Sequence, residues 1–250
     1  MKFIGVIPAR YGSTRFPGKP LALINGKSMI MHVYEQATNA SCLSDVVVAT
    51  DDKRIYQHVS ENGGKVLMTS EQHPSGTDRV FEAASLLIKD KNHLNDYVII
   101  NIQGDEPFID PSAINTLSEC FKDPGVNIAT LIKKINTREE LLDKNVVKVI
   151  TGKSKRALYF SRSPLPFIRG AELSDWLSEY SFFKHIGIYA YKGETLKKIA
   201  GLDPSPLERA EGLEQLRWLD NGYAIYAEVT DYESISIDTP DDLLKITNKD

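Results

Sequence analysis

Short apolar runs alternate along the first half of the chain with segments in which apolar residues recur at every third or fourth position. The runs contain β-branched residues and end at polar or turn-forming residues, as buried strands do. The segments between them have the periodicity of amphipathic helices. This alternation predicts a mostly parallel central sheet with helices on both faces. The predicted strands are residues 3–7, 46–50, 66–68 and 98–102, and the predicted helices are residues 28–39, 53–62 and 77–90.

The second half of the chain has a less regular pattern. A helix at 111–121 and a strand at 126–133 are followed by β-rich runs at 146–150, 157–160 and 186–191. Helices at 193–200 and 207–219, strands at 224–229 and 235–237, and a C-terminal helix capped by Thr239 and begun by Pro240 complete the prediction. We expect one domain over residues 1–250, with residues from about 130 to 190 as a β-rich insertion used for dimerisation. The segment from Pro164 to Glu179 has no clear periodicity.

The composition is that of an ordinary globular protein and excludes several classes. The 250 residues have a net charge of −4, which argues against a dedicated nucleic-acid-binding protein. No apolar stretch is long enough to span a membrane, and Arg10 interrupts the apolar start before it could form a signal sequence. The two cysteines, Cys42 and Cys120, suit a reducing compartment. We therefore expect a cytoplasmic protein without a nucleic-acid or membrane partner.

A basic loop follows the first predicted strand, which we expect Pro8 to end because proline brings no N–H to a strand ladder. Its three cations, Arg10, Arg15 and Lys19, lie just beyond a strand's carboxyl end, where open α/β sheets bind ligands. This arrangement favours a polyanion such as a triphosphate over a solvated surface loop. The loop is not an ATPase-type P-loop, because Pro20 stands where Ser or Thr would bind magnesium.

Several carboxylates also follow predicted strands. Asp105 is the strongest candidate for a ligand of Mg²⁺, which prefers hard oxygen donors and usually takes one or two carboxylates plus phosphates and waters. For Asp238, spacing alone leaves a metal ligand and a turn residue equally open. We interpret Asp51 and Asp52 as turn or cap residues.

His185 and Tyr189 lie four residues apart in a predicted strand, so their side chains point to the same face. They line a pocket or form a half-buried polar pair, and the sequence leaves both open. The histidines have no HxH or HExxH spacing, which argues against zinc. Neither a nucleophile elbow nor a dinucleotide-binding glycine motif is present. These patterns favour phosphate and metal chemistry without a covalent nucleophile.

The segment IPARYGSTRFPGKPL, residues 7–21, resembles the signature of the 3-deoxy-manno-octulosonate (Kdo) cytidylyltransferases, also called CMP-Kdo synthetases. Further blocks follow in the family's order over nearly the whole chain. They are residues 75–79, 101–107, 159–162, 185–189, 205–208, 213–217 and 238–243. The segment from Pro164 to Glu179 matches least. The resemblance implies a Rossmann-like nucleotidyltransferase fold, a homodimer, and transfer of CMP from CTP to Kdo for lipopolysaccharide core synthesis.

The resemblance also implies roles for individual residues. Lys19, Asp105 and Asp238 would be catalytic, and the two aspartates would hold Mg²⁺. The nucleotide would contact Ala9, Arg10, Ser13, Arg15, Lys19, Ser75, Arg79 and Gln103. The sugar would contact Arg79, Gln103, Arg162, His185, Tyr189, Glu214 and Gln215.

Other functions remain open at this point. Cytidylyl transfer to 8-amino-Kdo or to a sialic acid would use the same blocks. A metal-dependent glycosyltransferase would share the sheet and the strand-end aspartates, but it has no obvious need for a triphosphate loop. A non-catalytic nucleotide sensor would bind CTP and release no pyrophosphate.

Overall fold

The computed structural model describes residues 1–12, 15–88 and 91–247. Within these residues, nine strands form one sheet, in which seven follow the order β11-β7-β10-β6-β1-β4-β5 and β8 and β9 extend from β10. All neighbours in the seven-strand path are parallel except at β10, which is antiparallel to both β6 and β7. The predicted mostly parallel sheet is thus confirmed. The strands are β1 Lys2–Ala9, β4 Leu43–Thr50, β5 Val66–Met68, β6 Tyr97–Asn101, β7 Ile128–Lys134, β8 Lys148–Thr151, β9 Ala157–Ser161, β10 Phe183–Lys192 and β11 Ile225–Val229.

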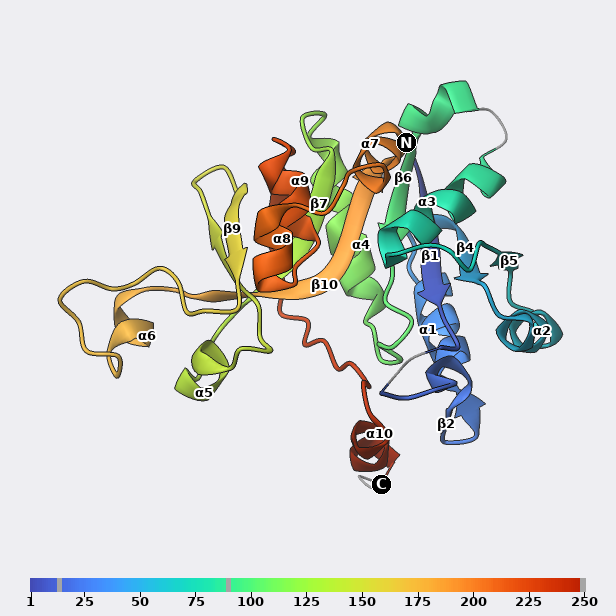
Figure 1. Ribbon diagram of the computed structural model, residues 1–250, viewed down its shortest axis with the longest axis horizontal. Helices are drawn as coiled ribbons and strands as arrows, with labels where there is room; N and C mark the ends of the chain where they lie inside the picture. Colours follow the sequence, from blue (N-terminus) through green and yellow to red (C-terminus); the bar gives the residue numbers. More distant parts are fainter. Residues whose placement is uncertain (13–14, 89–90, 248–250) are drawn as a thin grey trace.

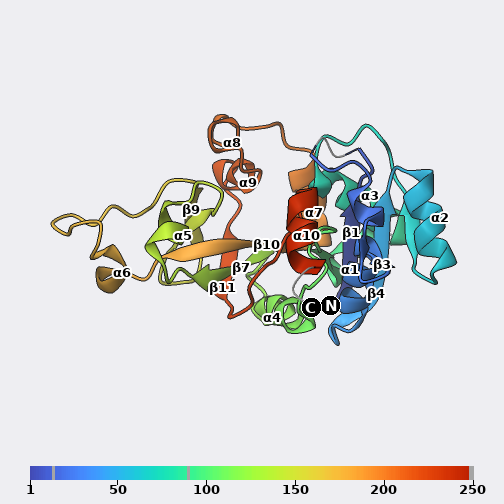
Figure 2. The same ribbon diagram turned by 90° about the horizontal axis from the view of Figure 1, so that it is seen from below.

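Helices cover both faces of the sheet (Figures 1 and 2). Along β1, Ile4 and Val6 pack into one apolar cluster, and Ile7 and Ala9 pack into the other. Successive side chains of a strand point to opposite faces, so a strand buried on both faces is apolar at every position. The first cluster includes residues of α3 (Gly76–Leu87), α7 (Gly193–Ala200) and α9 (Gln215–Asp220), and the second includes residues of α1 (Met29–Thr38), α2 (Lys53–Glu61) and α4 (Pro111–Glu119).

The helix predicted at 207–219 is wrong, because the structure has two helices there. The first, α8 (Pro206–Glu211), has a capping box between Ser205 and Glu208. It ends at Gly212, whose φ of 63° is the left-handed conformation that favours glycine and terminates helices. The second helix, α9, then packs Leu216 and Trp218 against the sheet. Apolar spacing alone did not reveal this break.

Two strand predictions are corrected. β1 continues through Pro8 to Ala9. The Val6 carbonyl accepts from Ile102 N on the β6 side, and Pro8, two residues on, faces the same side beyond the last residue pair with β6. Its missing N–H therefore costs no ladder bond. Residues 235–237 form no strand, because only Ile237 N makes a backbone bond there, to Asp105 O at 3.0 Å.

Short elements complete the described chain, several of them without a sequence prediction. They are η1 Lys19–Leu21, the hairpin β2 Leu23–Ile24 and β3 Lys27–Ser28, η2 Lys91–Asp96, η3 Cys120–Lys122, α5 Arg138–Leu142, α6 Trp176–Glu179 and the C-terminal α10 Pro240–Thr247. No helix among the described residues is both long and apolar enough to cross a membrane.

The predicted β-rich insertion projects from one end of the molecule (Figure 1). The first half of β10 stays paired with β7 there, and its other edge pairs with β8 instead of β6. β8 pairs in turn with β9. A small apolar cluster of its own, with Trp176 and Phe182 among its members, connects α5 and α6 to this arm. Its use in dimerisation remains a prediction.

Candidate active site

The carboxyl ends of β1, β4 and β6 lie at one edge of the sheet, because these three strands are parallel neighbours. The basic loop leaves β1 at this edge and turns back at Gly18, whose φ is 71° and whose N–H donates to Tyr11 O at 2.9 Å. The return places Lys19 beside the turn that follows β6. Gly104 in that turn lies so close to β1 that a Cβ atom would meet Pro8 O at 2.7 Å. The two loops therefore pack backbone against backbone, and the glycine is required for that approach.

Lys19 bridges the two aspartates that the sequence singles out. Its Nζ lies 2.7 Å from Asp105 Oδ2 and 3.3 Å from Asp238 Oδ1. Arg15 Nη2 also contacts Asp238 Oδ1, at 3.2 Å. Only 14% of the Lys19 side chain is exposed, so this ammonium is shielded from water and exerts a stronger field than a surface lysine. Lys19, near the start of the chain, thus meets Asp105 from the middle of the chain and Asp238 from near its end.

The two aspartates are a suitable donor set for a divalent cation. Two carboxylates already converge on one cation, and Mg²⁺ is commonly held by one or two carboxylates together with substrate phosphates. No group of three or more His, Cys, Asp or Glu side chains that could hold a metal is found in the described part of the chain. A metal bound here would therefore complete its coordination with substrate oxygens and water.

A cavity of about 210 Å³ lies beside the basic loop, where the nucleotide is predicted to bind. Arg10 at its wall donates from Nη2 to the carbonyls of His73, at 2.7 Å, and Ser75, at 3.1 Å. The Ser75 side chain caps α3 in a reciprocal pair with Asp78. The cavity is lined by Pro8, Ala9, Arg10, Gly12, Lys19, Pro20, Gln103, Gly104 and Asp105. Ser13, also predicted to bind the nucleotide, lies outside the described residues.

A second cavity, of about 240 Å³, meets the first at Gln103, which lines both. It brings together five of the seven residues predicted for the sugar: Gln103, His185, Tyr189, Glu214 and Gln215. The Gln103 amide donates to Gly187 O at 2.7 Å, which fixes the side chain between the cavities. None of the residues lining this cavity is a lysine or an arginine.

The second cavity also contains two buried polar atoms without a hydrogen-bond partner among the described residues, Trp218 Nε1 and the Tyr189 hydroxyl, whereas the Tyr191 hydroxyl bonds to the side chains of Asn101 and Thr77. Buried polar groups are rarely left unpaired, and such groups at a cavity wall indicate a polar ligand or water. Sequence reasoning missed Asn101, Tyr191 and Trp218. Tyr191 follows Tyr189 at the two-residue strand period, and Trp218 follows Glu214 at helical spacing, so both periodicities contained the signal.

Burial shifts the pKa values of His185 and Glu214 in opposite directions. Burial lowers the pKa of His185 to about 3, so its ring is neutral at physiological pH. Thr130 Oγ1 lies 2.7 Å from Ile188 O and 3.0 Å from His185 Nε2. Its one hydroxyl proton suits the carbonyl, so Nε2–H donates to the threonine and Nδ1 remains an acceptor. Burial likewise raises the pKa of Glu214, whose Oε2 accepts from Thr77 at 3.0 Å.

Four predicted contact residues, Arg15, Ser75, Arg79 and Arg162, line neither cavity. Of these, Arg79 and Arg162 bind other parts of the protein. Arg79 has a fully buried side chain that forms an ion pair with Asp51 and a hydrogen bond to Thr69. Burial lowers its pKa, and the charge of Asp51 opposes that shift. Arg162 donates to the carbonyls of Glu211, at 2.7 Å, and Lys144, at 3.1 Å. The structure thus places both guanidinium groups among protein partners, and their roles in ligand binding remain predictions.

The remaining strand-end aspartates have structural partners. Asp52 caps α2 by accepting from Arg54 N at 2.8 Å, which confirms its interpretation as a cap residue. Asp51 is the ion-pair partner of Arg79 rather than a simple turn residue.

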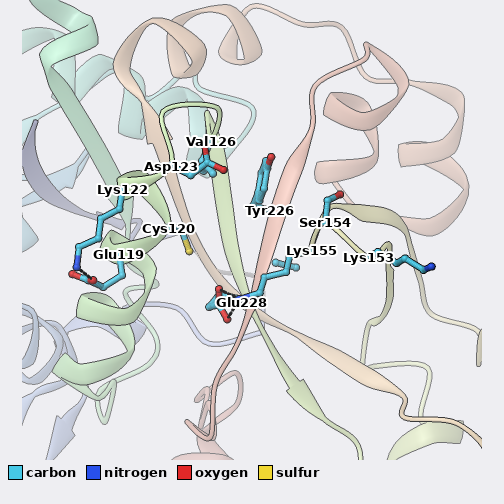
Figure 3. Close-up of a pocket in the computed structure, with 11 residues that line it drawn as sticks. Glu119, Cys120, Lys122, Asp123, Val126, Lys153, Ser154, Lys155, Tyr226 and Glu228 are labelled. Carbon is cyan, nitrogen blue, oxygen red and sulfur yellow. Dashed lines mark hydrogen bonds and ion pairs between the residues drawn. The ribbon is translucent and has the colours of Figure 1, made fainter.

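A larger cavity of about 480 Å³ lies away from these residues, between η3, β11 and the turn joining β8 to β9 (Figure 3). None of the predicted site residues lines it. Its charges are largely paired, Lys122 with Glu119 and Lys155 with Glu228 (Figure 3). Burial raises the pKa of the Cys120 thiol to about 11, so the thiol is protonated and unreactive. Size alone therefore does not identify the active site.

Comparisons with known proteins agree with this geometry. A family model described as Cytidylyltransferase matches residues 4–233. The 3-deoxy-manno-octulosonate cytidylyltransferase of Bacteroides thetaiotaomicron is 53% identical over 246 residues, covering 97% of this chain and 96% of the relative. The enzyme of the same name from Parabacteroides distasonis is 52% identical over 249 residues, covering 98% and 96%.

A solved structure gives the same result in three dimensions. CMP:2-keto-3-deoxy-manno-octonic acid synthetase complexed with CTP matches with a TM-score of 0.88 at 41% identity, covering 99% of this chain and 97% of that one. The match spans both cavities and the arm. On these grounds the chain belongs to the cytidylyltransferase family, and within it to the 3-deoxy-manno-octulosonate cytidylyltransferases.

Proposed function

We propose that this protein transfers CMP from CTP to the anomeric hydroxyl of 3-deoxy-manno-octulosonate and releases pyrophosphate. The observation that carries the proposal is the meeting of two chemically different cavities at Gln103 in a chain about half identical to enzymes of that name. The cationic cavity at the end of β1 suits a triphosphate. The second cavity, without cationic side chains and rich in hydroxyl and amide groups, suits the hydroxyl groups of a sugar.

The reaction needs positioning and charge neutralisation more than covalent catalysis. The anomeric oxygen attacks the α-phosphorus, the bond from that phosphorus to the bridging oxygen of pyrophosphate breaks, and the hydroxyl proton leaves to solvent. Lys19, Arg10 and Arg15 supply cations where negative charge accumulates, and such preorganised charges are worth more in a shielded site. The acceptor nitrogen of His185 and the Glu214 carboxyl orient sugar hydroxyls by accepting their protons in hydrogen bonds.

We place the sugar's carboxylate at the junction of the two cavities, outside the second cavity. A carboxylate in the second cavity would face neutral groups and Glu214 at a high desolvation cost. At the junction with the first cavity it meets Lys19 and the metal position instead. Asp105 and Asp238 would hold Mg²⁺, which supplies Lewis-acid charge neutralisation when it is bound.

The test is pyrophosphate release by the purified protein with Mg²⁺, each of the four nucleoside triphosphates, and Kdo, 8-amino-Kdo or a sialic acid. We expect release to require CTP, Kdo and Mg²⁺ together, and EDTA to abolish it. Release with 8-amino-Kdo alone would change the substrate and retain the mechanism. A protein that binds CTP and releases no pyrophosphate with any of these sugars would be a nucleotide sensor.

We also propose that the arm forms a homodimer. Phe167 is 75% exposed and Leu158 is 63% exposed, and both lie on the projecting arm (Figure 1). Large apolar side chains exposed together in one region are typical of association surfaces. Light scattering after gel filtration should give twice the mass of the chain, and Phe167→Ser with Leu158→Ser should shift it toward the monomer.

A further inference from the structure

Asp238 lies near the end of a segment that forms neither a helix nor a strand. Residues 230–239, the C-terminal strap, run in an extended path from the end of β11 to the start of α10 (Figures 1 and 2). Two backbone hydrogen bonds attach it, from Thr230 N to Ile132 O at 2.9 Å and from Ile237 N to Asp105 O at 3.0 Å. No strand ladder holds the residues between these bonds, so side chains must fix their path.

Ion pairs of Glu233 with Lys133 and Lys184 hold the part of the strap beside β7 and β10. A buried carboxylate provides a further contact, to the turn that contains Asp105. The Tyr232 hydroxyl donates to Glu106 Oε2 at 3.2 Å, and the Ser234 side chain also hydrogen-bonds to Glu106. Glu106 is only 4% exposed, and no lysine or arginine among the described residues forms an ion pair with it. Burying a carboxylate without a cation costs free energy, which hydrogen bonds from hydroxyl donors reduce. The same bonds fix the position of the donor side chains on the strap.

Glu106 directly follows Asp105, and both belong to the turn after β6. That turn is closed by backbone bonds from Glu106 N to Gln103 O at 3.3 Å and from Ile109 N to Glu106 O at 3.1 Å. The strap therefore meets one rigid turn twice, through Tyr232 at Glu106 and through Ile237 at Asp105. Neither Glu106 nor Tyr232 lines the nucleotide cavity, so direct contact with the substrates does not explain them.

We propose that Glu106 and Tyr232 form a clasp that positions Asp238 opposite Asp105, and that the two are positioning residues for the metal site. The proposal rests on the proposed function, in which both aspartates hold Mg²⁺. Ile237, buried against Ile24 and Met29, anchors the end of the strap, and the clasp sets its approach. Without the clasp the strap adopts other conformations, and Asp238 lies opposite Asp105 for a smaller fraction of the time.

The experiment compares Tyr232→Phe, Glu106→Gln and the double variant with the wild type. Tyr232→Phe removes one hydroxyl and preserves the ring that packs on the core. The matched control is Tyr226→Phe on β11, which removes the hydroxyl that accepts a hydrogen bond from Arg156 at 3.3 Å in the cavity of Figure 3. Free Mn²⁺ is measured by electron paramagnetic resonance with CTP present and sugar absent, and Mg²⁺ activation of pyrophosphate release is measured separately.

We expect Tyr232→Phe to weaken Mn²⁺ binding and to raise the Mg²⁺ concentration for half-maximal activity by about tenfold, as loss of an outer partner of a metal ligand does. At saturating Mg²⁺, kcat should stay within about twofold of the wild type, because the ligands themselves are intact. The double variant should bind Mn²⁺ no more weakly than the more affected single variant, because both substitutions disrupt the same contact. Tyr226→Phe should bind Mn²⁺ as the wild type does.

If Mn²⁺ binding and Mg²⁺ activation are unchanged in Tyr232→Phe, the clasp is refuted. This holds even if the variant has a lower melting temperature, because a merely structural contact would lower stability alone. If Glu106→Gln does not fold, the tyrosine variant alone decides. A wild-type protein that binds Mn²⁺ with CTP and transfers CMP to no sugar would refute the proposed function, and the Mn²⁺ comparison would still test the clasp.

Discussion

The two cavities that meet at Gln103 differ in how their polar groups are satisfied. In the cavity beside the basic loop, Lys19 is paired with Asp105 and Asp238, and Arg10 donates to two backbone carbonyls. In the second cavity, the buried Tyr189 hydroxyl and Trp218 Nε1 have no hydrogen-bond partner among the described residues. In the proposed function, a triphosphate and a metal would exchange existing ion pairs for new ones, whereas a sugar would add hydrogen bonds to groups that lack them.

This difference separates the kinetic effects of substitutions. Groups that neutralise charge in the transition state change kcat, and groups that bind an unreacting part of the substrate change KM. We therefore expect variants of the first cavity to lose turnover and variants of the second to lose affinity for the sugar.

The largest effect is expected for Asp105→Asn and Asp238→Asn. Each change removes one anionic oxygen donor from the metal position and preserves the shape of the side chain. Turnover should fall by about a thousandfold, because Mg²⁺ requires charged oxygen ligands here and its charge neutralisation is worth several kcal/mol. Steady-state pyrophosphate release at saturating Mg²⁺ measures it.

The control for these variants is Asp110→Asn, since Asp110 caps α4 at the end of the same turn and asparagine also caps helices. It should retain wild-type turnover. A folded Asp238→Asn variant at full rate would remove that residue from the metal site.

The second effect concerns Arg79, for which ligand contact was predicted. Its buried pairing with Asp51 indicates a structural contribution. Arg79→Met should lower the free energy of unfolding by about 3 kcal/mol, because it leaves Asp51 without its cation. Denaturant unfolding measures this loss.

Arg54→Met is the matched comparison, because Arg54 forms an ion pair with Asp52 at the end of the same strand on the exposed surface. It should leave the free energy of unfolding close to that of the wild type, because exposed ion pairs contribute little to stability. An Arg79→Met protein of wild-type stability that has lost affinity for sugar or CTP would support the ligand contact instead.

Arg79 also shows where sequence reasoning reached its limit. The alternation of strands and helices, the placing of the basic loop at a strand end and the choice of Asp105 required only local patterns, and the sheet has that architecture. Whether a cation faces a ligand or a buried aspartate depends on a contact 28 residues away in the chain, between Arg79 and Asp51. Local sequence patterns do not contain that information.

The convergence of Asp238 with Lys19 was similarly beyond spacing, since 219 residues separate them. The resemblance to a known family supplied that assignment, and the structure brings the two side chains within 3.3 Å. The sugar-side residues Tyr191 and Trp218 were within reach of simple periodicity. They were missed because aromatic residues at strand and helix spacing usually belong to a core.

A third effect sharpens the contrast between the cavities. Glu214→Gln removes an acceptor of sugar hydroxyls and leaves the first cavity unchanged. The KM for Kdo should rise by about tenfold, as for one lost hydrogen bond, and the KM for CTP should stay within about twofold. Initial rates with each substrate varied in turn measure both.

Glu228→Gln, in the cavity between η3 and β11, is the control for this variant and should change neither constant (Figure 3). An equal rise of both KM values in Glu214→Gln would show that the two cavities do not act separately.

The smallest effect concerns the protonation state of His185 in the neutral cavity. Its folded pKa of about 3 lies below the ordinary value of 6.5, so between these values the unfolded chain binds a proton that the folded chain does not. Stability from this residue is therefore complete above about pH 6.5 and falls as the pH decreases, by on the order of 1–2 kcal/mol at about pH 5. His185→Gln lacks this loss, so its free energy of unfolding relative to the wild type should improve on acidification. A constant difference between about pH 7 and pH 5 would show that the folded structure does not lower the pKa of His185, and the ring would then gain a proton below about pH 6.5.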